Sequence, residues 1–417
     1  MPTLFLIDGN SQMYRAYHAI RGLSGPDGRP TNAVYGFVTM LRKLIADHRP
    51  DYIGAAFDLE GPTFRDTLVG DYKANRAPMP GDLVEQVPLV HRACAALGVP
   101  VMTVAGFEAD DVIGTLATRG AAQGFDVAIV TGDKDFYQLV GGRIRVFNPR
   151  DDGAWFDEGG LVQKFGVPPA RVIDVLALTG DAVDNIKGVP GIGEKGAREL
   201  VAEFGSLDAL LERAADVQQK RYREALLAHA DDARRSRELV TIRTDVPLDV
   251  TFASLKYEGP KRQACFDLFS QLGFRSLVTD YAPTADQVSA DYAIVESLEE
   301  LDGVVASARA AGSVGLRVLA DDRSPMRAAL VGIALSTADR TVRYVPVGHR
   351  ALDSAGNLDE QGVLERIAIL AGDPGIEKIG HDVKFDGLVL ARHGVEVAGP
   401  GFDTMLASYL IDSTRAP

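Results

Sequence analysis

Short apolar runs alternate with helical patterns over the first 170 residues. The runs at 3–7 (TLFLI), 52–57 (YIGAAF) and 127–131 (VAIVT) are each followed by turn-forming residues, as is typical of buried parallel strands. Between them, residues 33–47 and 83–97 have the apolar spacing of helices. This alternation predicts an α/β fold with a parallel sheet over residues 1–170.

The rest of the chain divides into three further segments. Residues 171–280 are mostly helical in pattern, with long polar stretches such as QQKRYREALLAHADDARRSREL. Residues 281–290 (YAPTADQVSA) have the composition of a linker. Residues 291–417 begin again with strand-like and helix-like runs, so we expect a second α/β domain there.

Composition indicates a soluble protein of several domains. The chain has 417 residues, 46% of them hydrophobic and 24% charged, which is too long for one ordinary core. We see no apolar run of about 20 residues and no signal-peptide pattern, and the two cysteines, Cys94 and Cys265, are far apart. We therefore expect a cytoplasmic protein that is not bound to a membrane.

Acidic residues follow the candidate strands and recur in pairs beyond them. Because sites in open α/β sheets form at the carboxyl ends of strands, we expect these side chains to converge on one edge. They are Asp8, Asp58, Glu108, Asp110, Asp111, Asp133, Asp135, Asp181 and Asp184. Such a cluster needs hard cations, and two Mg²⁺ ions would suit phosphodiester cleavage. The net charge of −14 disfavours nucleic-acid binding taken alone, but a two-metal site itself requires excess carboxylates.

Other interpretations of the acidic residues are also open. An Asp after a strand is often only a helix N-cap or a turn former, and Glu108, Asp110 and Asp111 could simply complement a helix dipole. An Asp after the first strand is also the nucleophile of haloacid-dehalogenase-type phosphatases. That chemistry needs a second Asp two positions on, where this chain has Asn10.

Two segments are candidates for phosphate contact. The first, GPTFRDTLVGDYKANRAPMPGDL, is basic and aromatic: Lys73 and Arg76 would share a helix face, and Arg65 lies upstream. The second, KGVPGIGEKGARELVAEFG, is a glycine-rich hairpin before a helix that begins near Lys195, and its backbone N–H groups could bind phosphate. The alternatives are a solvated basic loop and a plain helical hairpin.

These motifs together resemble the 5′-nuclease family, which includes the 5′-nuclease domain of bacterial DNA polymerase I and the flap endonucleases. The matching segments are LIDGNSQMYRAYHA, TNAVYGF, AAFD…TFR…YKANR, GFEADDVIGTLA, TGDKDFYQLV and LTGDAVDNIKGVPGIGEKGA. Over about residues 1–280, the resemblance implies a PIN-like sheet, a helical arch and a helix–three-turn–helix subdomain. The chain resembles the front part of such a polymerase.

The resemblance also implies roles for individual residues. The first metal would be held by Asp8, Asp58, Glu108, Asp110 and Asp111, and the second by Asp133, Asp135, Asp181 and Asp184, with Mg²⁺ or Mn²⁺ as the ion. The catalytic residues would be Asp8, Asp110, Lys73 and Arg76. The DNA contacts would come from Tyr14, Arg65, Tyr72, Lys73, Arg76, Gly188, Val189, Gly191, Ile192, Gly193 and Lys195. In related flap endonucleases the hairpin also holds a monovalent cation, here K⁺ at the carbonyls of Gly188, Val189 and Ile192.

Residues 291–417 resemble the proofreading 3′-5′ exonuclease domain of the same polymerases in part. IGHDVKFDGLVL and GFDTMLASYLIDS match, with Asp386 at an acidic position of the second motif. The first motif should be Asp-x-Glu, and SVGLRVLAD places Arg317 and Leu319 there. The third motif would lie beyond Pro417. We therefore expect a degenerate, truncated domain without 3′-exonuclease activity.

Two hypotheses about function follow. The first is a structure-specific 5′-nuclease that acts as a monomer on flapped DNA and on RNA–DNA primers in replication and repair. The second is a non-catalytic module that binds branched DNA. The nine carboxylates favour the first, since binding alone gains nothing from acids that face a polyanion.

Overall fold

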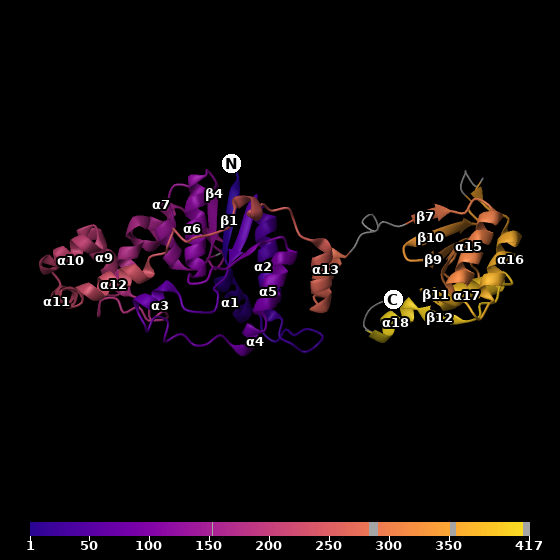
Figure 1. Ribbon diagram of the computed structural model, residues 1–417, viewed down its shortest axis with the longest axis horizontal. Helices are drawn as coiled ribbons and strands as arrows, with labels where there is room; N and C mark the ends of the chain where they lie inside the picture. Colours follow the sequence, from indigo (N-terminus) through magenta and orange to yellow (C-terminus); the bar gives the residue numbers. More distant parts are fainter. Residues whose placement is uncertain (152, 283–290, 351–355, 412–417) are drawn as a thin grey trace. The chain divides into compact units, whose positions relative to one another are not determined.

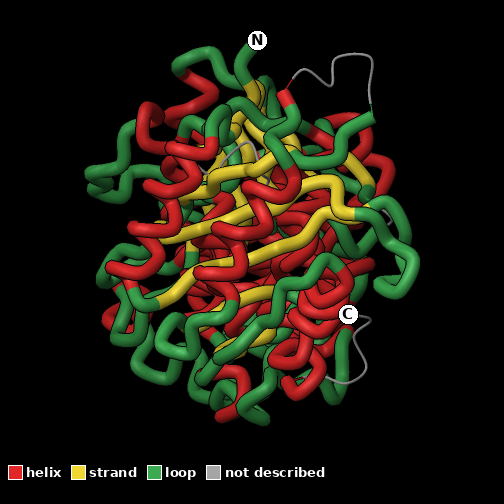
Figure 2. Tube along the Cα trace, turned by 90° about the vertical axis from the view of Figure 1, so that its right-hand side faces the viewer, coloured by secondary structure: helices red, strands yellow, loops and turns green. Residues whose placement is uncertain are grey.

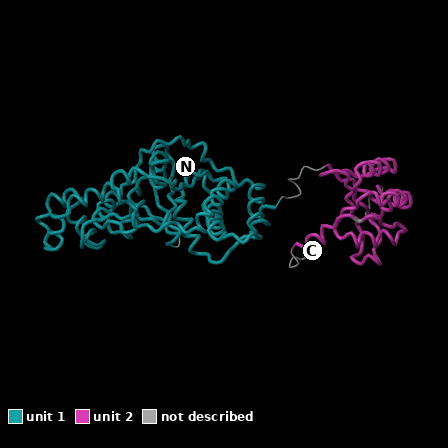
Figure 3. The backbone as a smooth tube through the Cα atoms, turned by 60° about the horizontal axis from the view of Figure 1, so that its bottom comes forward, with its two compact units in different colours: residues 1–282 teal, residues 283–417 magenta. Residues whose placement is uncertain are grey.

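The structure, a computed structural model, divides into two compact units, residues 1–282 and 283–417 (Figure 3). It describes residues 1–151, 153–282, 291–350 and 356–411. The predicted linker at 281–290 lies outside the described residues except for its first two. Both helices and strands contribute to the structure (Figure 2), and after residue 157 the elements of unit 1 are all helical.

Unit 1 is built on a six-stranded sheet in the order β3-β2-β1-β4-β5-β6. Its strands are β1 (Thr3–Asp8), β2 (Tyr52–Ala56), β3 (Val101–Met102), β4 (Asp126–Val130), β5 (Ile144–Asn148) and β6 (Ala154–Phe156). All neighbouring strands are parallel except β5 and β6. The three strands predicted from apolar runs are confirmed as β1, β2 and β4, which are adjacent.

The central strand β1 is buried on both faces, which explains its uninterrupted apolar sequence. Leu4 and Leu6 face one hydrophobic core, and Phe5 and Ile7 face a second core. Helix α6 covers the first face, and α2 and α5 cover the second (Figure 1). A strand between two helical layers has no polar face, so its pattern shows no alternation.

The helices of unit 1 follow the predicted pattern with one break. Residues 33–47 lie in α2, but 83–97 divide into α4 and α5, because Pro88 occupies the first turn of a new helix. The helices are α1 (Gly9–Ala19), α2 (Asn32–His48), α3 (Phe64–Leu68), α4 (Gly81–Val84), α5 (Val87–Ala96), α6 (Ala109–Ala122), η1 (Lys134–Leu139), α7 (Glu158–Phe165), η2 (Pro169–Arg171), α8 (Val172–Thr179), α9 (Glu194–Phe204), α10 (Leu207–Glu212), η3 (Ala214–Asp216), α11 (Lys220–Ala228), α12 (Ala230–Val240), η4 (Phe252–Leu255), α13 (Arg262–Gln271) and α14 (Arg275–Tyr281). Within the described residues, none of them has the length and apolar character that a membrane crossing requires.

The helical segment after residue 170 continues the first core of the sheet. Leu4 of β1 and Val175 of α8 belong to the same buried cluster, which extends to Leu226 and Leu239. Helices α8, α9 and α12 pack together at its far end (Figure 1). The predicted division near residue 170 therefore falls inside one continuous core.

Unit 2 contains its own six-stranded sheet, in the order β12-β11-β8-β9-β10-β7. Its elements are β7 (Asp291–Ile294), α15 (Leu298–Ala311), β8 (Ser313–Ala320), β9 (Leu330–Ala338), β10 (Thr341–Pro346), α16 (Glu360–Ala371), β11 (Glu377–Gly380), α17 (Val383–Arg392), β12 (Pro400–Asp403) and α18 (Thr404–Ile411). Strand β9 is antiparallel to both neighbours, and the other pairings are parallel. A separate core fills the unit, as predicted for an independent α/β domain.

The hairpin between α8 and α9 provides a test of this packing. Gly188 has a φ of +59°, and a Cβ there would lie 2.5 Å from the backbone of Thr179 and Gly180. We expect Gly188→Ala to lower the free energy of unfolding by about 1–3 kcal/mol or more. Gly193→Ala is the matched control, because Gly193 has a φ of −88° and no atom within 4 Å of its Cβ position. Equal urea midpoints for the two variants would contradict this account.

Candidate functional site

The predicted acids gather at the carboxyl edge of the unit 1 sheet. Asp8 ends β1, while Asp58 and Asp133 follow β2 and β4. Strands β2 and β3 lie on one side of β1, and β4 lies on its other side. The edge beside β1 and β4 is therefore a topological switch point, where ligands bind in open α/β sheets. A pocket of about 490 Å³ opens here, lined by Asp8, Asn10, Ser11, Tyr14, Asp58, Lys73, Arg76, Glu108, Ala109, Asp110, Gly132, Asp133, Lys134, Arg150, Val183 and Asp184.

Asp8 lies at the centre of this edge and is only 5% exposed. Its carboxylate caps α1 by accepting a hydrogen bond from the Ser11 amide (2.9 Å), and it accepts a second one from the Thr131 hydroxyl (2.7 Å). Burial raises its pKa to about 6, and the charges of Asp133 and Asp58 add to the increase. Asp8 therefore has a structural role as an N-cap and also contributes to a strongly negative site.

Helix α6 brings the next acids to the pocket. The Asp58 carboxylate accepts hydrogen bonds from the Ala109 amide (2.8 Å) and from the Asn10 side chain (2.5 Å), so it fixes the start of α6. In the first turn of α6, burial raises the pKa of Asp110 well above its ordinary value. The charges of Asp8, Asp133, Asp58 and Glu108 raise it further.

A second group of acids lies across the pocket. Asp133 caps η1 by accepting a hydrogen bond from the Asp135 amide (2.9 Å). Burial raises the pKa of Asp135 well above its ordinary value, and Asp133, Asp181 and Asp184 add to this effect. Asp181 and Asp184 belong to a turn after α8, not to a helix, and the Asp181 carboxylate accepts from the Val183 amide (2.7 Å). Asp135 and Asp181 are not among the residues that line the pocket.

Lys73 and Arg76 reach the pocket from a turn. The basic segment at 61–83, which the resemblance assigns to a helical arch, contains the short α3, a turn over residues 70–75 and the start of α4. Lys73 has a φ of +56°, and its amide donates to the Asp184 carbonyl (3.0 Å), which fastens the turn to the second acidic group. The prediction that Lys73 and Arg76 share a helix face is therefore wrong, although both line the pocket.

The Lys73 ammonium lies 2.6 Å from a Glu108 oxygen. Although burial disfavours the charged ammonium, Glu108 and Asp184 raise its pKa. Lys73 is therefore a cation held over the acidic pocket.

Three predicted contact residues lie behind the pocket instead. Arg65 is 3% exposed and forms a bidentate pair with Asp111, at 2.7 and 2.9 Å. Asp111 is fully buried, and one of its oxygens also accepts from the Arg243 amide (2.9 Å). Tyr72 is 7% exposed, with its hydroxyl 3.3 Å from Glu108. This burial argues against DNA contact by Arg65 and Tyr72 and against metal binding by Asp111.

The pocket also contains residues that the sequence did not single out. Lys134 and Arg150 bring two further cations, and Asn10 and Ser11 line the floor beside Asp8. Lys134 lies between Asp133 and Asp135 in TGDKD, so the sequence already indicated that it is close to the site. Arg150 follows β5, and only the pairing of β5 with β4 brings it to the site. Tyr14, predicted from its aromatic character, does line the pocket.

The glycine-rich hairpin leads into α9 as predicted, with Gly193 at the N-cap and Glu194 as the first helical residue. The amides of Gly188, Val189 and Ile192 point inward, however, and donate to Ser236 Oγ, the Leu178 carbonyl and the Val189 carbonyl. They are not available for phosphate. The remaining candidate for phosphate contact in this segment is the first turn of α9, where the Lys195 side chain is 92% exposed.

The donor set of the pocket suits a hard divalent cation. All of its acidic ligand atoms are carboxylate oxygens, and burial raises the pKa of several of them. In the described ranges, no three acidic, histidine or cysteine side chains form a ready-made metal cage. Mg²⁺ does not need one, because it retains several waters and takes one or two carboxylates together with substrate phosphates.

In unit 2 the structure brings Arg317 and Asp386 together. Arg317 on β8 lies 3.2 Å from Asp386 on α17 and also donates to the His381 carbonyl. Asp386 is 1% exposed, and burial raises its pKa to about 6 even though Arg317 opposes the shift. Leu319, two residues along β8, is 49% exposed.

The acidic cluster predicts an unusual pH dependence of stability. Because the pKa of Asp8 is about 6 in the folded protein against an ordinary 3.8, the folded state retains this proton after the unfolded chain has released it. The free energy of unfolding should therefore fall as the pH rises between these values. In EDTA, Asp8→Asn should reduce this slope and stabilise the protein above pH 6 by up to about 3 kcal/mol. Urea midpoints measured across the window, with the exposed Asp249→Asn as control, test it; an unchanged slope would contradict it.

Replacement of Arg65 should lower the stability of the protein much more than replacement of Arg76. Breaking the buried pair by Arg65→Ala should lower the free energy of unfolding by about 3–5 kcal/mol, because Asp111 is left without its counter-ion. Arg76→Ala removes an exposed side chain and should change stability by no more than about 0.5 kcal/mol. Thermal unfolding of both variants checks this, and a fully stable Arg65→Ala protein would show that the ion pair is unimportant.

Comparisons with known proteins agree with this architecture. Residues 3–166 match the family model described as 5′-3′ exonuclease, N-terminal resolvase-like domain, and residues 167–263 match the model described as 5′-3′ exonuclease, C-terminal SAM fold. Residues 292–416 match a model described as 3′-5′ exonuclease.

Relatives and solved structures give the same result. DNA polymerase I of Pseudomonas aeruginosa is 38% identical over 99% of this chain and 47% of its own length, and the thermostable DNA polymerase I of Thermus aquaticus is 35% identical over 99% and 45%. The chain thus spans about half the length of these curated relatives. The T5 D15 protein has a TM-score of 0.51 at 19% identity, over 67% of this chain and 96% of its own, which shows a shared fold. The chain therefore belongs to the 5′-3′ exonuclease family over residues 3–263 and carries a 3′-5′ exonuclease-family domain at 292–416.

Proposed function

We propose that residues 1–282 form a divalent-metal-dependent 5′-nuclease that hydrolyses phosphodiester bonds in flapped or branched DNA and in RNA–DNA primers. The observation that carries the proposal is the pocket at the sheet edge. Acids at the end of β1, after β2 and β4, at the start of α6 and in the turn after α8 line it, and two basic side chains, Lys73 and Arg76, face the same space. This combination suits a site that holds cations and a phosphate together.

Two Mg²⁺ or Mn²⁺ ions would be held by two groups of carboxylates. Bound there, they would supply an activated water and stabilise the leaving oxygen. A T5 5′-exonuclease of the same fold has been solved with bound zinc, which supports a divalent site. Asp111 is left out because Arg65 occupies it. The first group is Asp8, Asp58, Glu108 and Asp110, and the second is Asp133, Asp135, Asp181 and Asp184.

The side chains around the pocket would position the substrate. Lys73 pairs with Glu108 in this structure, so an incoming phosphate would compete with Glu108 for the ammonium. Arg76, Lys134 and Arg150 add positive charge at the pocket, and Tyr14 offers a ring on which a base can stack. The first turn of α9 and Lys195 would bind the DNA backbone at a distance from the pocket, with K⁺ at the hairpin carbonyls.

The alternative, a non-catalytic module for branched DNA, explains the exposed basic residues but not the acids. Buried carboxylates with raised pKa values reduce stability and repel DNA. A protein that only binds DNA would gain neither stability nor affinity from this arrangement.

Replacement of the metal ligands tests the proposal. Asp8→Asn and Asp133→Asn should each reduce Mg²⁺-dependent cleavage of a 5′-flap by at least about a hundredfold, because each removes a carboxylate from one of the two groups. The control is Asp249→Asn, which changes an exposed acid outside the pocket. Both site variants should remain folded and bind the flap. Cleavage at the wild-type rate by either one would remove its residue from the site.

We further propose that the domain at 292–416 has no 3′-exonuclease activity. A two-metal exonuclease needs several acids, and here Arg317 places a cation against Asp386 while Leu319 offers no oxygen. The domain still buries a core of its own, which is consistent with a packing or spacing role.

A labelled strand tests the second domain. The Asp8→Asn/Asp133→Asn double variant should leave a 5′-labelled 3′-overhang intact in Mg²⁺ or Mn²⁺, because the 5′-nuclease is disabled and Arg317 and Leu319 stand where the resemblance expects two metal-binding acids. Progressive shortening from the 3′ end that disappears with Asp386→Ala would show that this domain is active.

A further inference from the structure

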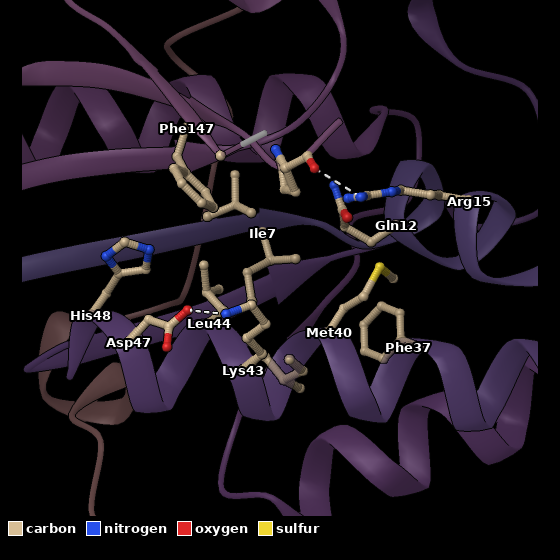
Figure 4. Close-up of a pocket in the computed structure, with 14 residues that line it drawn as sticks. Ile7, Gln12, Arg15, Phe37, Met40, Lys43, Leu44, Asp47, His48 and Phe147 are labelled. Atoms are coloured by element: carbon tan, nitrogen blue, oxygen red, sulfur yellow. Dashed lines mark hydrogen bonds and ion pairs between the residues drawn. The ribbon is translucent and has the colours of Figure 1, made fainter. Parts of the chain in front are cut away.

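A second cavity lies between the sheet of unit 1 and helices α1 and α2. Its volume is about 450 Å³, it is partly open, and residues of α1, α2 and the ends of β1, β4 and β5 line it (Figure 4). No residue lines both cavities. Its size falls within the range of about 300–1,000 Å³ that is usual for small-molecule sites.

One end of this cavity holds two buried donors without acceptors. Gln12 is 4% exposed, and its Nε2 has no hydrogen-bond partner among the described residues. In that part of the chain the same is true of Nη1 of Arg15, whose Nη2 donates to the Pro149 carbonyl at 2.8 Å. Figure 4 shows both side chains reaching the same end of the cavity. Because a buried donor without an acceptor is destabilising, an acceptor group of a ligand would be favoured here.

The charge at this end is positive and uncompensated. No ion pair of Arg15 occurs within the described ranges. Burial lowers the pKa of Arg15, and the charge of Arg150 lowers it further. At the opposite end, Lys43 and Asp47 neutralise one another at 2.7 Å. The cavity therefore presents one unmatched cation, which favours an anion.

The remaining wall is apolar and partly aromatic. Ile7, Phe37, Leu44 and Phe147 are buried hydrophobic residues that line it, and Met40 and His48 complete it (Figure 4). An apolar body of one or two rings would bury its surface here, at about 25 cal/mol per Å².

We propose that this cavity binds a small amphipathic anion. Its apolar or aromatic body would lie against Ile7, Leu44 and Phe147. Its carboxylate, sulfonate or phosphate group would accept hydrogen bonds from Gln12 and Arg15. The site is independent of the proposed nuclease activity, since it shares no lining residue with the acidic pocket.

Calorimetric titration of the full-length chain with 1-naphthalenesulfonate tests the proposal. This probe combines a two-ring body with one anionic group. 1-Naphthalenemethanol is the matched neutral ligand, because it has the same ring system without the charge. We expect the sulfonate to bind with a stoichiometry of one and the alcohol to bind about tenfold or more weakly, because it lacks a charge-assisted hydrogen bond.

Variants of the lining separate the two parts of the site. Arg15→Met should weaken sulfonate binding about ten- to hundredfold and leave alcohol binding nearly unchanged. Met40→Trp, which enlarges a half-buried side chain on the wall, should weaken both ligands. Arg21→Met is the control for loss of an arginine, because Arg21 is exposed and does not line the cavity.

Thermal unfolding of each variant shows whether a loss of binding is caused by a loss of folded protein. Without ligand, Arg15→Met should unfold no lower than Arg21→Met does, because it removes a partly buried cation that has no carboxylate partner in the described ranges. The proposal is overturned if the wild-type chain binds neither ligand, or if Arg15→Met and Met40→Trp, both folded, bind the sulfonate as tightly as the wild type. Either result would mean that the cavity holds only water.

Discussion

One buried guanidinium joins three parts of unit 1 that are distant in the sequence. Arg65 on α3 forms a bidentate pair with Asp111 on α6, and it donates to the carbonyls of Leu239 and Thr241 at the end of α12. It also lies 3.3 Å from Glu108, which in turn holds Lys73. This contact anchors the short helix α3, which has only five residues, while the Lys73 amide fastens the following turn to Asp184. A planar donor with five N–H groups is suited to such a junction in a way that a lysine is not.

The rest of the site opposes stability. Asp8 is buried and Asp110 and Asp135 are partly buried, and burial together with the charges of neighbouring carboxylates raises the pKa of all three. Each is secured by local structure: Asp8 caps α1, and Asp110 and Asp135 lie in the first turns of α6 and η1. Helix N-termini partly offset the repulsion, since their amides and dipoles favour negative charge. The fold therefore holds like charges close together by building them into the starts of its helices.

The place of the acidic site could be predicted from the sequence, because it depends on where the strands end. The apolar runs that became β1, β2 and β4 placed Asp8, Asp58 and Asp133 at one edge without any knowledge of side-chain contacts. Residue types did not reveal which members of a motif face inward. Arg65 and Arg76 have the same chemistry and lie eleven positions apart, yet one is buried by tertiary contacts with α6 and α12. Arg150 reaches the pocket only through the pairing of β5 with β4, a long-range contact that local pattern does not encode. The hairpin amides are occupied by α8 and Ser236 for the same reason.

The pairing of Arg317 with Asp386 limits how unit 2 could change over evolutionary time. Asp386 is almost fully buried and has one nearby cation. A substitution that placed an acid at position 317 would remove this cation and set two carboxylates against each other. That intermediate would be less stable than either the present arrangement or a complete metal site. The Arg317–Asp386 pair therefore opposes replacement of Arg317 by an acid in a single step, because that step leaves a buried carboxylate without its counter-ion.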